Sequence, residues 1–559
     1  MKKLTFYIIS LVVLPAVIHA QYTGGDGRGD VSLTLNNTFL ANYFKTAGNW
    51  SEVNNWSDAA LPTSVQNANI AAAAVVGDDY VHPALTIASV GSVTISPGKS
   101  LTISGTLTNH AGMSGLVICS NATGTGSLIH NTDNVNATIQ RYITGSTDLT
   151  IFKYHFVAVP LTSAASPVSN LFLDSYLENF SESTNSWVSM GASTTNPLDV
   201  TRGYMIYYPA ASTTYSFAGP MNNGSFTALT SYTTGYGYNL VPNPYPSAID
   251  WDAASGWTKT NVDNAVYIWP SDAGSGATAT NYASYVNSVS INSGSRYIAT
   301  GQSFFVHANA TSPVLTMDNG VRLHNGVQFF KTTESIPRLL RISCVANGAT
   351  DETVVRFTEA ATTGFDGNWD AYKMQGGADA PQLSSVASDN SNLSINSMPS
   401  GAGAVAVPVK FSFSTATDVT FTASGMESFN ENIPIYLEDL ALSKMVNLRL
   451  NPVYTFSYQT GNVIDRFILY FSGSVGTEEL SVGSGKAFIG NGRLFIDAPG
   501  MKGQMADITI HNSLGQLLST DKVVMNGIVS VDAPQNTGVF IVQVVTANQH
   551  FVAKVLNKQ

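Results

Sequence analysis

Short runs in which apolar and polar residues alternate recur along most of the chain. Ser92-Val93-Thr94-Ile95 and Leu101-Thr102-Ile103 are typical, and turn-forming residues follow each of them. Alternation with a period of two places the apolar side chains on one face of a β-strand. We find no long stretch with apolar residues at positions i, i+3, i+4 and i+7, which an amphipathic helix needs. The pattern therefore predicts an all-β, multi-domain protein.

Residues 21–140 are predicted to form a short β-solenoid or one stacked sheet. Strand-like runs follow one another at intervals of roughly 6 to 11 residues, each with inward apolar and outward Thr or Ser side chains. Trp50 and Trp56 precede these runs and are interpreted as a cap on the open end of the stack, although a sugar-stacking platform is the alternative. The runs are Leu85–Ile87, Ser92–Ile95, Leu101–Ile103, Leu107–Thr108, Leu116–Ile118 and Ser127–Ile129.

Three further modules follow, and each has its own composition. Residues 141–327 form an aromatic-rich β module, and residues 328–475 contain strands separated by turn signals, which is typical of a two-sheet β-sandwich. A linker at 476–485 leads to residues 486–559, where seven short strands predict a compact, immunoglobulin-like β-sandwich. Gly515 lies between two of those strands, where a hairpin needs a positive φ.

The composition narrows the class of protein further. The 559 residues carry a formal net charge of −11, and only 11% of them are charged. A basic surface for nucleic acid is therefore not expected. Cys119 and Cys344 lie in different predicted modules, so we expect two separately buried thiols rather than a disulfide. We predict no cofactor, with bound Ca²⁺ as the one exception considered below.

The N-terminal segment, residues 1–20, has the form of a secretory signal peptide. Met1-Lys2-Lys3 is charged, and a mostly apolar run from Leu4 to Ile18 ends just before the small residue Ala20. The run is shorter than the roughly 20 apolar residues that span a bilayer. We expect cleavage after Ala20 and a mature chain, from Gln21 onward, that lacks a transmembrane segment.

Three motifs near the C-terminus give an ordered pattern of Leu-Gly turn, Gly-aromatic strand and basic final strand. With these motifs, residues 486–559 resemble the type A sorting domain of proteins that the type IX secretion system (T9SS) of Bacteroidota exports. Gly515, Gly538, Phe540 and Lys554 are the motif residues, and Phe540 stands where the family usually has Tyr. The motifs are Asn512-Ser513-Leu514-Gly515-Gln516, Thr537-Gly538-Val539-Phe540-Ile541-Val542 and Phe551-Val552-Ala553-Lys554-Val555-Leu556.

This resemblance implies a route and a set of partners. Proteins of that kind pass through the periplasm and cross the outer membrane with the T9SS machinery. A sorting protease then removes the sorting domain, and the passenger is attached to envelope lipopolysaccharide or released. The expected location is therefore the outer-membrane cell surface or the medium.

One aromatic segment of the middle module could bind or cleave glycans. Asp250 and Asp252 flank Trp251, and in a strand both carboxylates would point to one face. With Tyr245 nearby, two facing carboxylates could line a glycoside-binding or glycoside-cleaving cleft. The interpretation that we favour is a turn with solvated Asp side chains beside a packed Trp.

Asp366 and Asp370 form a second group of carboxylates, around Trp369. Oxygen ligands four positions apart are compatible with Ca²⁺, although the EF-hand pattern is missing. The histidines and cysteines are scattered, and no motif typical of a catalytic nucleophile occurs. We therefore predict no catalytic residues and no metal ligands.

The sequence as a whole favours a non-enzymatic cell-surface or secreted protein, with a structural or adhesive passenger delivered by a T9SS sorting domain. The alternative is a secreted carbohydrate-binding or carbohydrate-active protein, with glycans as partners. The sequence leaves open the passenger's ligand, the oligomeric state, the cleavage point before the sorting domain, and whether the passenger is anchored or released.

Overall fold

The computed structural model of this chain describes residues 41–557 with gaps, and two short N-terminal strands. These strands, β1 (Ala20–Gln21) and β2 (Ser32–Leu33), pair antiparallel. The rest of the predicted signal peptide, and residues 476–484 of the predicted linker, lie outside the described residues. The gaps are 149–150, 163–170, 173–174, 192–197, 271–279, 325–335, 401–404, 432, 462–463, 472–484 and 548.

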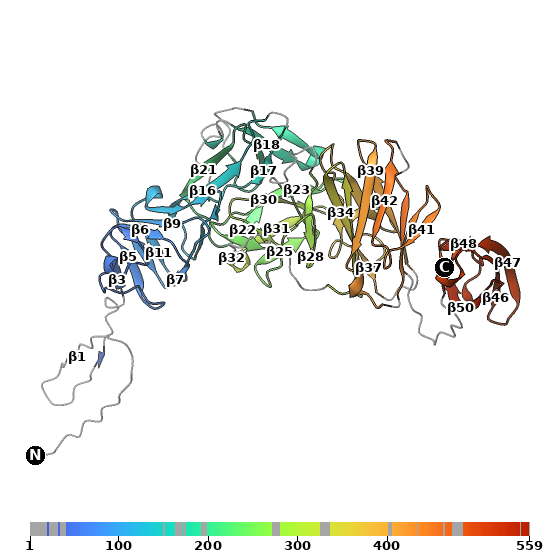
Figure 1. Cartoon of the computed structure of the whole chain (residues 1–559). Coiled ribbons are helices and arrows are strands. Elements are labelled where there is room, and N and C mark those ends of the chain that lie inside the picture. Colours follow the sequence, from blue (N-terminus) through green and yellow to red (C-terminus); the bar gives the residue numbers. More distant parts are fainter. Residues whose placement is uncertain are drawn as a thin grey trace, which may run out of the picture.

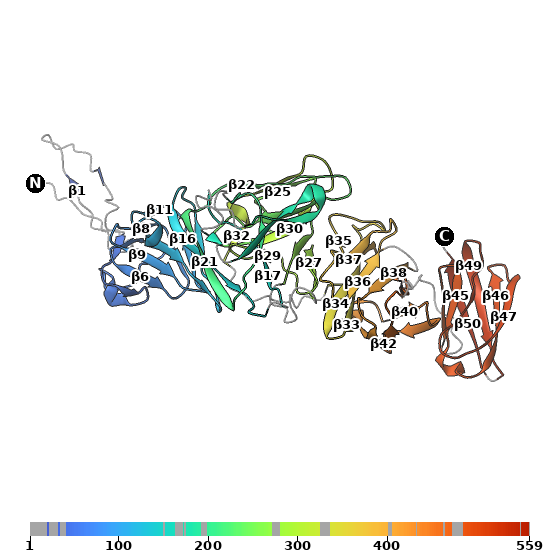
Figure 2. The same ribbon diagram turned by 90° about the horizontal axis from the view of Figure 1, so that it is seen from above.

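Strands form nearly all of the regular structure, so the predicted all-β, multi-domain fold is confirmed. Figures 1 and 2 show the chain as a row of four sections from the N-terminus to the C-terminus. No helix in the described residues is long and apolar enough to cross a membrane. The sections are named here the solenoid module (41–144), the middle module (151–324), the sandwich module (336–471) and the terminal module (485–557).

The solenoid module stacks most of its strands in parallel, in three sheets with the orders β3-β5-β8-β11, β4-β6-β9-β12-β16 and β7-β10-β15. The short strands β13 (Ser120–Asn121) and β14 (Gly124–Thr125) form a separate antiparallel pair. Register pairs such as Ile70 with Ile87, Ile95 with Ile118 and Leu101 with Leu128 place like side chains one above another. These stacked residues are fully buried, which makes one continuous core. The strands are β3 (Ala41–Phe44), β4 (Gly48–Asn49), β5 (Asn67–Ile70), β6 (Ala73–Val76), β7 (Tyr80–His82), β8 (Leu85–Ile87), β9 (Ser92–Ile95), β10 (Ser100–Ile103), β11 (Leu107–Asn109), β12 (Leu116–Ile118), β15 (Ser127–His130) and β16 (Asn136–Thr144).

The solenoid continues into the middle module through one long strand. β16 pairs in parallel with β12 on one edge. On its other edge it pairs antiparallel with β21 (Ser212–Pro220) over nine residue pairs. The predicted boundary at residue 140 therefore falls inside a strand that both modules share.

The middle module combines several small antiparallel sheets. A five-stranded sheet, β23-β30-β26-β27-β28, forms its centre. Aromatic and aliphatic residues from these sheets pack in two clusters, one of which also contains Val354 and Ile395 of the sandwich module. The strands are β17 (Tyr154–Val157), β18 (Tyr176–Ser181), β19 (Ser186–Ser189), β20 (Tyr204–Tyr207), β22 (Phe226–Ala228), β23 (Tyr238–Pro242), β24 (Ala248–Asp250), β25 (Trp257–Thr260), β26 (Val266–Ile268), β27 (Ala283–Val286), β28 (Val289–Ile291), β29 (Tyr297–Ile298), β30 (Ser303–His307), β31 (Val314–Met317) and β32 (Arg322–Leu323).

The sandwich module is one hydrogen-bonded sheet that folds back on itself. Its strands follow the path β41-β40-β43-β38-β36-β37-β34-β33-β39-β42, with β35 paired to β37. Phe421 of β39 and Phe467 of β43 are distant along this path, yet their ring centroids lie 5.0 Å apart in a shared core. The strands are β33 (Leu339–Ala346), β34 (Ala349–Thr358), β35 (Ala371–Tyr372), β36 (Gln382–Val386), β37 (Asn392–Pro399), β38 (Val405–Ser412), β39 (Thr417–Ser424), β40 (Ile435–Asp439), β41 (Lys444–Asn447), β42 (Val453–Tyr458) and β43 (Phe467–Phe471).

The terminal module is a small two-sheet sandwich with its own core. The sheets have the orders β44-β45-β48 and β47-β46-β49-β50. Residues from both sheets, including Leu494 and Val542, are buried in one cluster. These strands correspond to the seven predicted ones: β44 (Lys486–Gly490), β45 (Arg493–Asp497), β46 (Met505–Asn512), β47 (Leu517–Val524), β48 (Val529–Asp532), β49 (Gly538–Val545) and β50 (His550–Asn557).

Candidate functional site

The two aromatic residues of the predicted glycan cleft lie inside the middle module. Tyr245 is 0% exposed, and its hydroxyl donates to the carbonyl oxygens of Gly224 (2.7 Å) and Met317 (3.2 Å). Trp251 is 1% exposed, and its indole N–H donates to the carbonyl of Asn264 at 2.8 Å. A sugar stacks on an exposed ring face, so neither ring is placed to receive one.

The two carboxylates of that cleft point to different partners. Asp250 ends β24, and its carboxylate accepts hydrogen bonds from Nε (2.6 Å) and Nη2 (2.5 Å) of Arg296. Asp252 lies in the turn after the strand and accepts the hydroxyl of Tyr285. Because β24 stops at Asp250, the two carboxylates do not share one face of a strand, and the favoured interpretation, a turn beside a packed Trp251, agrees with the structure. The pair is therefore not a facing acid and base.

A lysine that sequence reasoning missed completes this region. Nζ of Lys259, on β25, lies 3.4 Å from the centroid of the Trp251 ring and 2.8 Å from Oδ1 of Asn264. Burial lowers the pKa of Lys259 to about 8, although Asp252 and Asp250 favour the charged form. Its role here is a cation–π contact that closes the remaining face of the indole.

The two carboxylates considered for Ca²⁺, Asp366 and Asp370, accept backbone N–H groups. Asp370 is fully buried, and its carboxyl group accepts the N–H groups of Asp366 (2.7 Å) and Ser397 (2.6 Å). Burial raises the pKa of Asp370 to about 7. Within the described residues, no group of three or more His, Cys, Asp and Glu side chains could hold a metal ion.

The remaining residues singled out in the first three modules have structural positions. Trp50 and Trp56 are fully buried at the start of the solenoid, with ring centroids 4.8 Å apart, and the indole of Trp56 donates to the carbonyl of Trp50. Both cysteines are free; Cys344 is buried, whereas Cys119 is only partly buried. The expectation of two fully buried thiols therefore holds for Cys344 alone.

The residues of the sorting-type motif shape the terminal module. Gly515 has φ +81° in the hairpin between β46 and β47, as the turn requires. Side-chain Oδ1 of Asn512 accepts the backbone N–H groups of Leu514 and Gln516, which fixes the same turn. At the start of β49, Gly538 has φ +146°. Phe540 is buried in the core, whereas Lys554 is exposed on the last strand.

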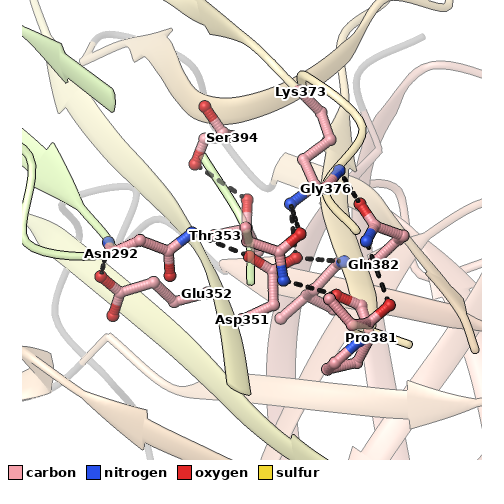
Figure 3. A network of polar contacts seen from close by, with 12 residues as sticks. Asn292, Asp351, Glu352, Thr353, Lys373, Gly376, Pro381, Gln382 and Ser394 are labelled. Carbon is pink, nitrogen blue, oxygen red and sulfur yellow. Dashed lines mark hydrogen bonds and ion pairs between the residues drawn. The ribbon is translucent and has the colours of Figure 1, made fainter. Parts of the chain in front are cut away.

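A buried polar cluster joins the middle and sandwich modules, and sequence reasoning did not find it. It consists of Asn292, Asp351 and Lys373, which Figure 3 labels, together with Asn281, and is called here the polar joint. Lys373 Nζ lies 2.6 Å from Asp351 Oδ2, and the two side chains are 3% and 0% exposed. Asn292 donates to the other carboxylate oxygen at 3.0 Å. Asp351 and Lys373 lie singly in strand-rich segments, and no sequence motif indicates that the two would be buried together.

A second contact, between the sandwich and terminal modules, is aromatic. Tyr436 and Tyr470 meet Phe488 and Phe495, and this group is called here the aromatic joint. The rings of Tyr436 and Phe488 are stacked with centroids 4.9 Å apart, and Tyr470 lies 5.1 Å from Phe495. The Tyr436 hydroxyl also donates to Asp497 at 3.0 Å.

Comparison with known proteins places most of the chain in one family. No curated protein matches the sequence. Among solved structures, a chain described as the Bacillus anthracis TIE protein is 8% identical over 79% of this chain and 70% of its own, with a TM-score of 0.10, which supports no shared fold. The family model described as "Domain of unknown function (DUF8693)" matches residues 44–471. Because this match covers more than half of the sequence, the chain belongs to the DUF8693 family.

Proposed function

We propose that this chain is an exported cell-surface or secreted protein, in which the terminal module directs export and residues 44–471 are the passenger. The observation that carries the proposal is that the family match ends close to where the terminal module begins. The family match ends at Phe471, the last residue of β43, and the separately folded terminal module begins at residue 485. The terminal module folds separately from the family region, and its motifs resemble a type IX sorting domain. Both features suit a sorting signal for secretion.

The passenger fits a structural or adhesive role. Its solenoid, middle and sandwich modules are joined by a shared strand and a shared core, which makes an extended, rigid body. The residues considered for glycan chemistry are used in internal contacts: Trp251 is buried, and Asp250 and Asp252 bind Arg296 and Tyr285. The partners of this proposal are the T9SS machinery, its sorting protease and envelope lipopolysaccharide, and the location is the outer-membrane surface or the medium.

Deletion of residues 486–559 tests the export role. The truncated protein is expected to accumulate in the periplasm, whereas the full chain reaches the surface or the medium. As a matched control, residues 472–559 are fused to a periplasmic reporter protein, which should then appear outside the cell. Surface display of the truncated passenger, or retention of the fused reporter, would contradict the proposal.

A further inference from the structure

The polar joint places an amine, an amide and a carboxylate together in a site that excludes water. Lys373 follows β35 in the sandwich module, Asp351 lies on β34, and Asn281 precedes β27 in the middle module. Asn281 is 4% exposed, and the side chains of Lys373 and Asp351 are 3% and 0% exposed. Burying an ammonium and a carboxylate this deeply is unfavourable because both lose their hydration, and their mutual attraction only partly offsets this.

The amide of Asn281 has its oxygen turned toward the amine. Its Nδ2 donates to the carbonyl oxygens of Thr350 (3.0 Å) and Pro381 (2.8 Å). Carbonyls only accept hydrogen bonds, so this end of the amide must be the nitrogen. Oδ1 therefore faces Lys373, 3.4 Å from Nζ. The carbonyl carbon bonded to that oxygen is therefore an amide electrophile that faces the amine.

The backbone holds the amide in this place. A Cβ atom on Gly376 would lie 2.1 Å from Oδ1 and 2.8 Å from Cγ of Asn281, so only glycine allows the chain to pass this close. The backbone N–H of neighbouring Gly377 donates to the carbonyl of Thr280 at 2.7 Å. When two reacting groups are held near contact, their orientation alone lowers the barrier to reaction.

Asp351 is fixed as a carrier of protons. Its Oδ2 accepts from Lys373 Nζ (2.6 Å) and from the backbone N–H of Leu383 (2.6 Å), and Oδ1 accepts from Asn292 (3.0 Å). Figure 3 shows Lys373 and Asn292 reaching the carboxylate from different sides. The next residue, Glu352, binds Arg341 and the N–H of Asn292, so it is engaged elsewhere.

We propose that Lys373 and Asn281 form an intramolecular isopeptide bond that ties the sandwich module to the middle module. The Lys373 ammonium gives a proton to the Asp351 carboxylate, and the neutral amine attacks Cγ of Asn281. The new N–Cγ bond forms as the Cγ–Nδ2 bond breaks. The amine's second proton and the proton held on Asp351 go to the departing nitrogen, which leaves as ammonium, and Asp351 is again a carboxylate. No oxidant or co-reactant is needed.

The surroundings favour this reaction over the persistent ion pair. Both charges are buried away from water, and the reaction consumes the buried ammonium while it returns Asp351 to the carboxylate that its hydrogen bonds stabilise. The absence of bulk water leaves no competing nucleophile to hydrolyse the amide. The product keeps the Asp351 hydrogen bonds and replaces a charged amine with a neutral amide N–H.

Peptide mapping of the full chain tests the bond directly. The isopeptide removes one ammonia from the mass and blocks trypsin at Lys373. The expected species is therefore a branched peptide in which residues 260–296 are joined to residues 357–410. Two separate peptides, with cleavage after Lys373, would show that the pair is an ion pair only and would overturn the proposal. Loss of one water with a link from Lys373 to Asp351 would also overturn it.

Variants separate the chemistry from simple proximity. Asp351→Asn keeps the shape of the side chain but removes the proton carrier, so the peptides should be recovered unlinked and at full mass. Gly376→Ala displaces the amide of Asn281, so linkage should fall or vanish while Lys373 and Asp351 remain. Full linkage in Asp351→Asn would contradict the assigned role of the carboxylate.

Lys259 gives a matched control within the same digest. Its ammonium also contacts an amide oxygen, that of Asn264, at 2.8 Å. However, its described hydrogen bonds run to that oxygen and to the carbonyl of Trp251, and none of them runs to a carboxylate. Without a bonded carboxylate to carry protons, Lys259 should be cleaved normally by trypsin. A link at Lys259 as well as Lys373 would show that contact alone suffices.

Discussion

Acid is expected to weaken the solenoid through one buried histidine. His130, on β15, is fully buried, and its Nδ1 lies 3.0 Å from the carbonyl oxygen of Thr132. Because a carbonyl only accepts, Nδ1 carries the proton, and the described residues offer no partner to the buried Nε2. Burial, aided by the charge of Arg322, lowers the pKa of His130 from 6.5 to about 4.

The sign and size of the effect follow from this depressed pKa. Below pH 6.5 the unfolded chain binds a proton at His130, whereas the folded chain does so only near pH 4. The stabilisation is therefore complete above pH 6.5, is lost as the pH falls, and levels off below about 4. Linkage gives a loss of about 2 kcal/mol at pH 5 and about 3 kcal/mol at pH 4.

Hydrogen exchange can isolate this loss in a chain of several modules, where a single global unfolding energy is not defined. The opening free energies of amides in β10 and β15 are compared at pH 7 and pH 5, after correction for intrinsic exchange rates. The same measurement on His130→Asn, which retains a donor near Thr132, removes the titrating group. His82 and His324, whose pKa values burial also lowers, remain in both proteins. Equal pH dependence in the variant and the wild type would refute the reasoning.

Two further predictions concern aromatic residues. Trp251→Ala should destabilise the middle module by about 3–5 kcal/mol, because it removes a fully buried side chain. Urea unfolding measures this, and retained stability with lost binding to insoluble polysaccharides would favour the glycan alternative instead. Across the aromatic joint, Tyr436→Ala and Phe488→Ala should show a coupling energy of about 0.5–1.5 kcal/mol in a double-mutant cycle. Strict additivity would mean that the two modules do not dock through these rings.

The strand pattern was readable wherever one face of a strand is buried and the other is solvated. All six predicted runs between Leu85 and Ile129 are strands, as are the seven predicted in the terminal module. In both regions apolar side chains alternate with polar ones, so the period of two is visible in the sequence. The middle module was harder to interpret, because strands such as β20 and β27 are buried on both faces and lose the alternation.

The contacts between modules were not readable, because they depend on residues far apart in the sequence. Asn281 and Lys373 lie 92 positions apart, and each is unremarkable in its own segment. The Asp250–Trp251–Asp252 segment shows the opposite case: a local pattern suggested a cleft, but Arg296 and Tyr285, brought in by the fold, occupy both carboxylates. A local sequence pattern can suggest which side chains could bind a ligand, but the tertiary contacts decide whether those side chains are available.

The three joints differ in what must break for the modules to separate. The solenoid and middle modules share the β16–β21 ladder, so parting them costs backbone hydrogen bonds along nine residue pairs. The middle and sandwich modules share a core, backbone hydrogen bonds such as Asn264 to Gly367, and the polar joint.

By contrast, the contacts described between the sandwich and terminal modules are made by side chains: an aromatic stack and hydrogen bonds such as those of Tyr436 with Asp497 and of Tyr470 with Asn491. Side-chain interfaces between domains resemble transient protein–protein interfaces. They are expected to separate at a lower free energy than a shared sheet or a shared core. Of the described modules, the terminal module is thus the one whose separation we expect to disturb the fold of the others least. The proposed export function requires a sorting module that can separate from the passenger in this way. The family match also ends at Phe471, next to the aromatic joint.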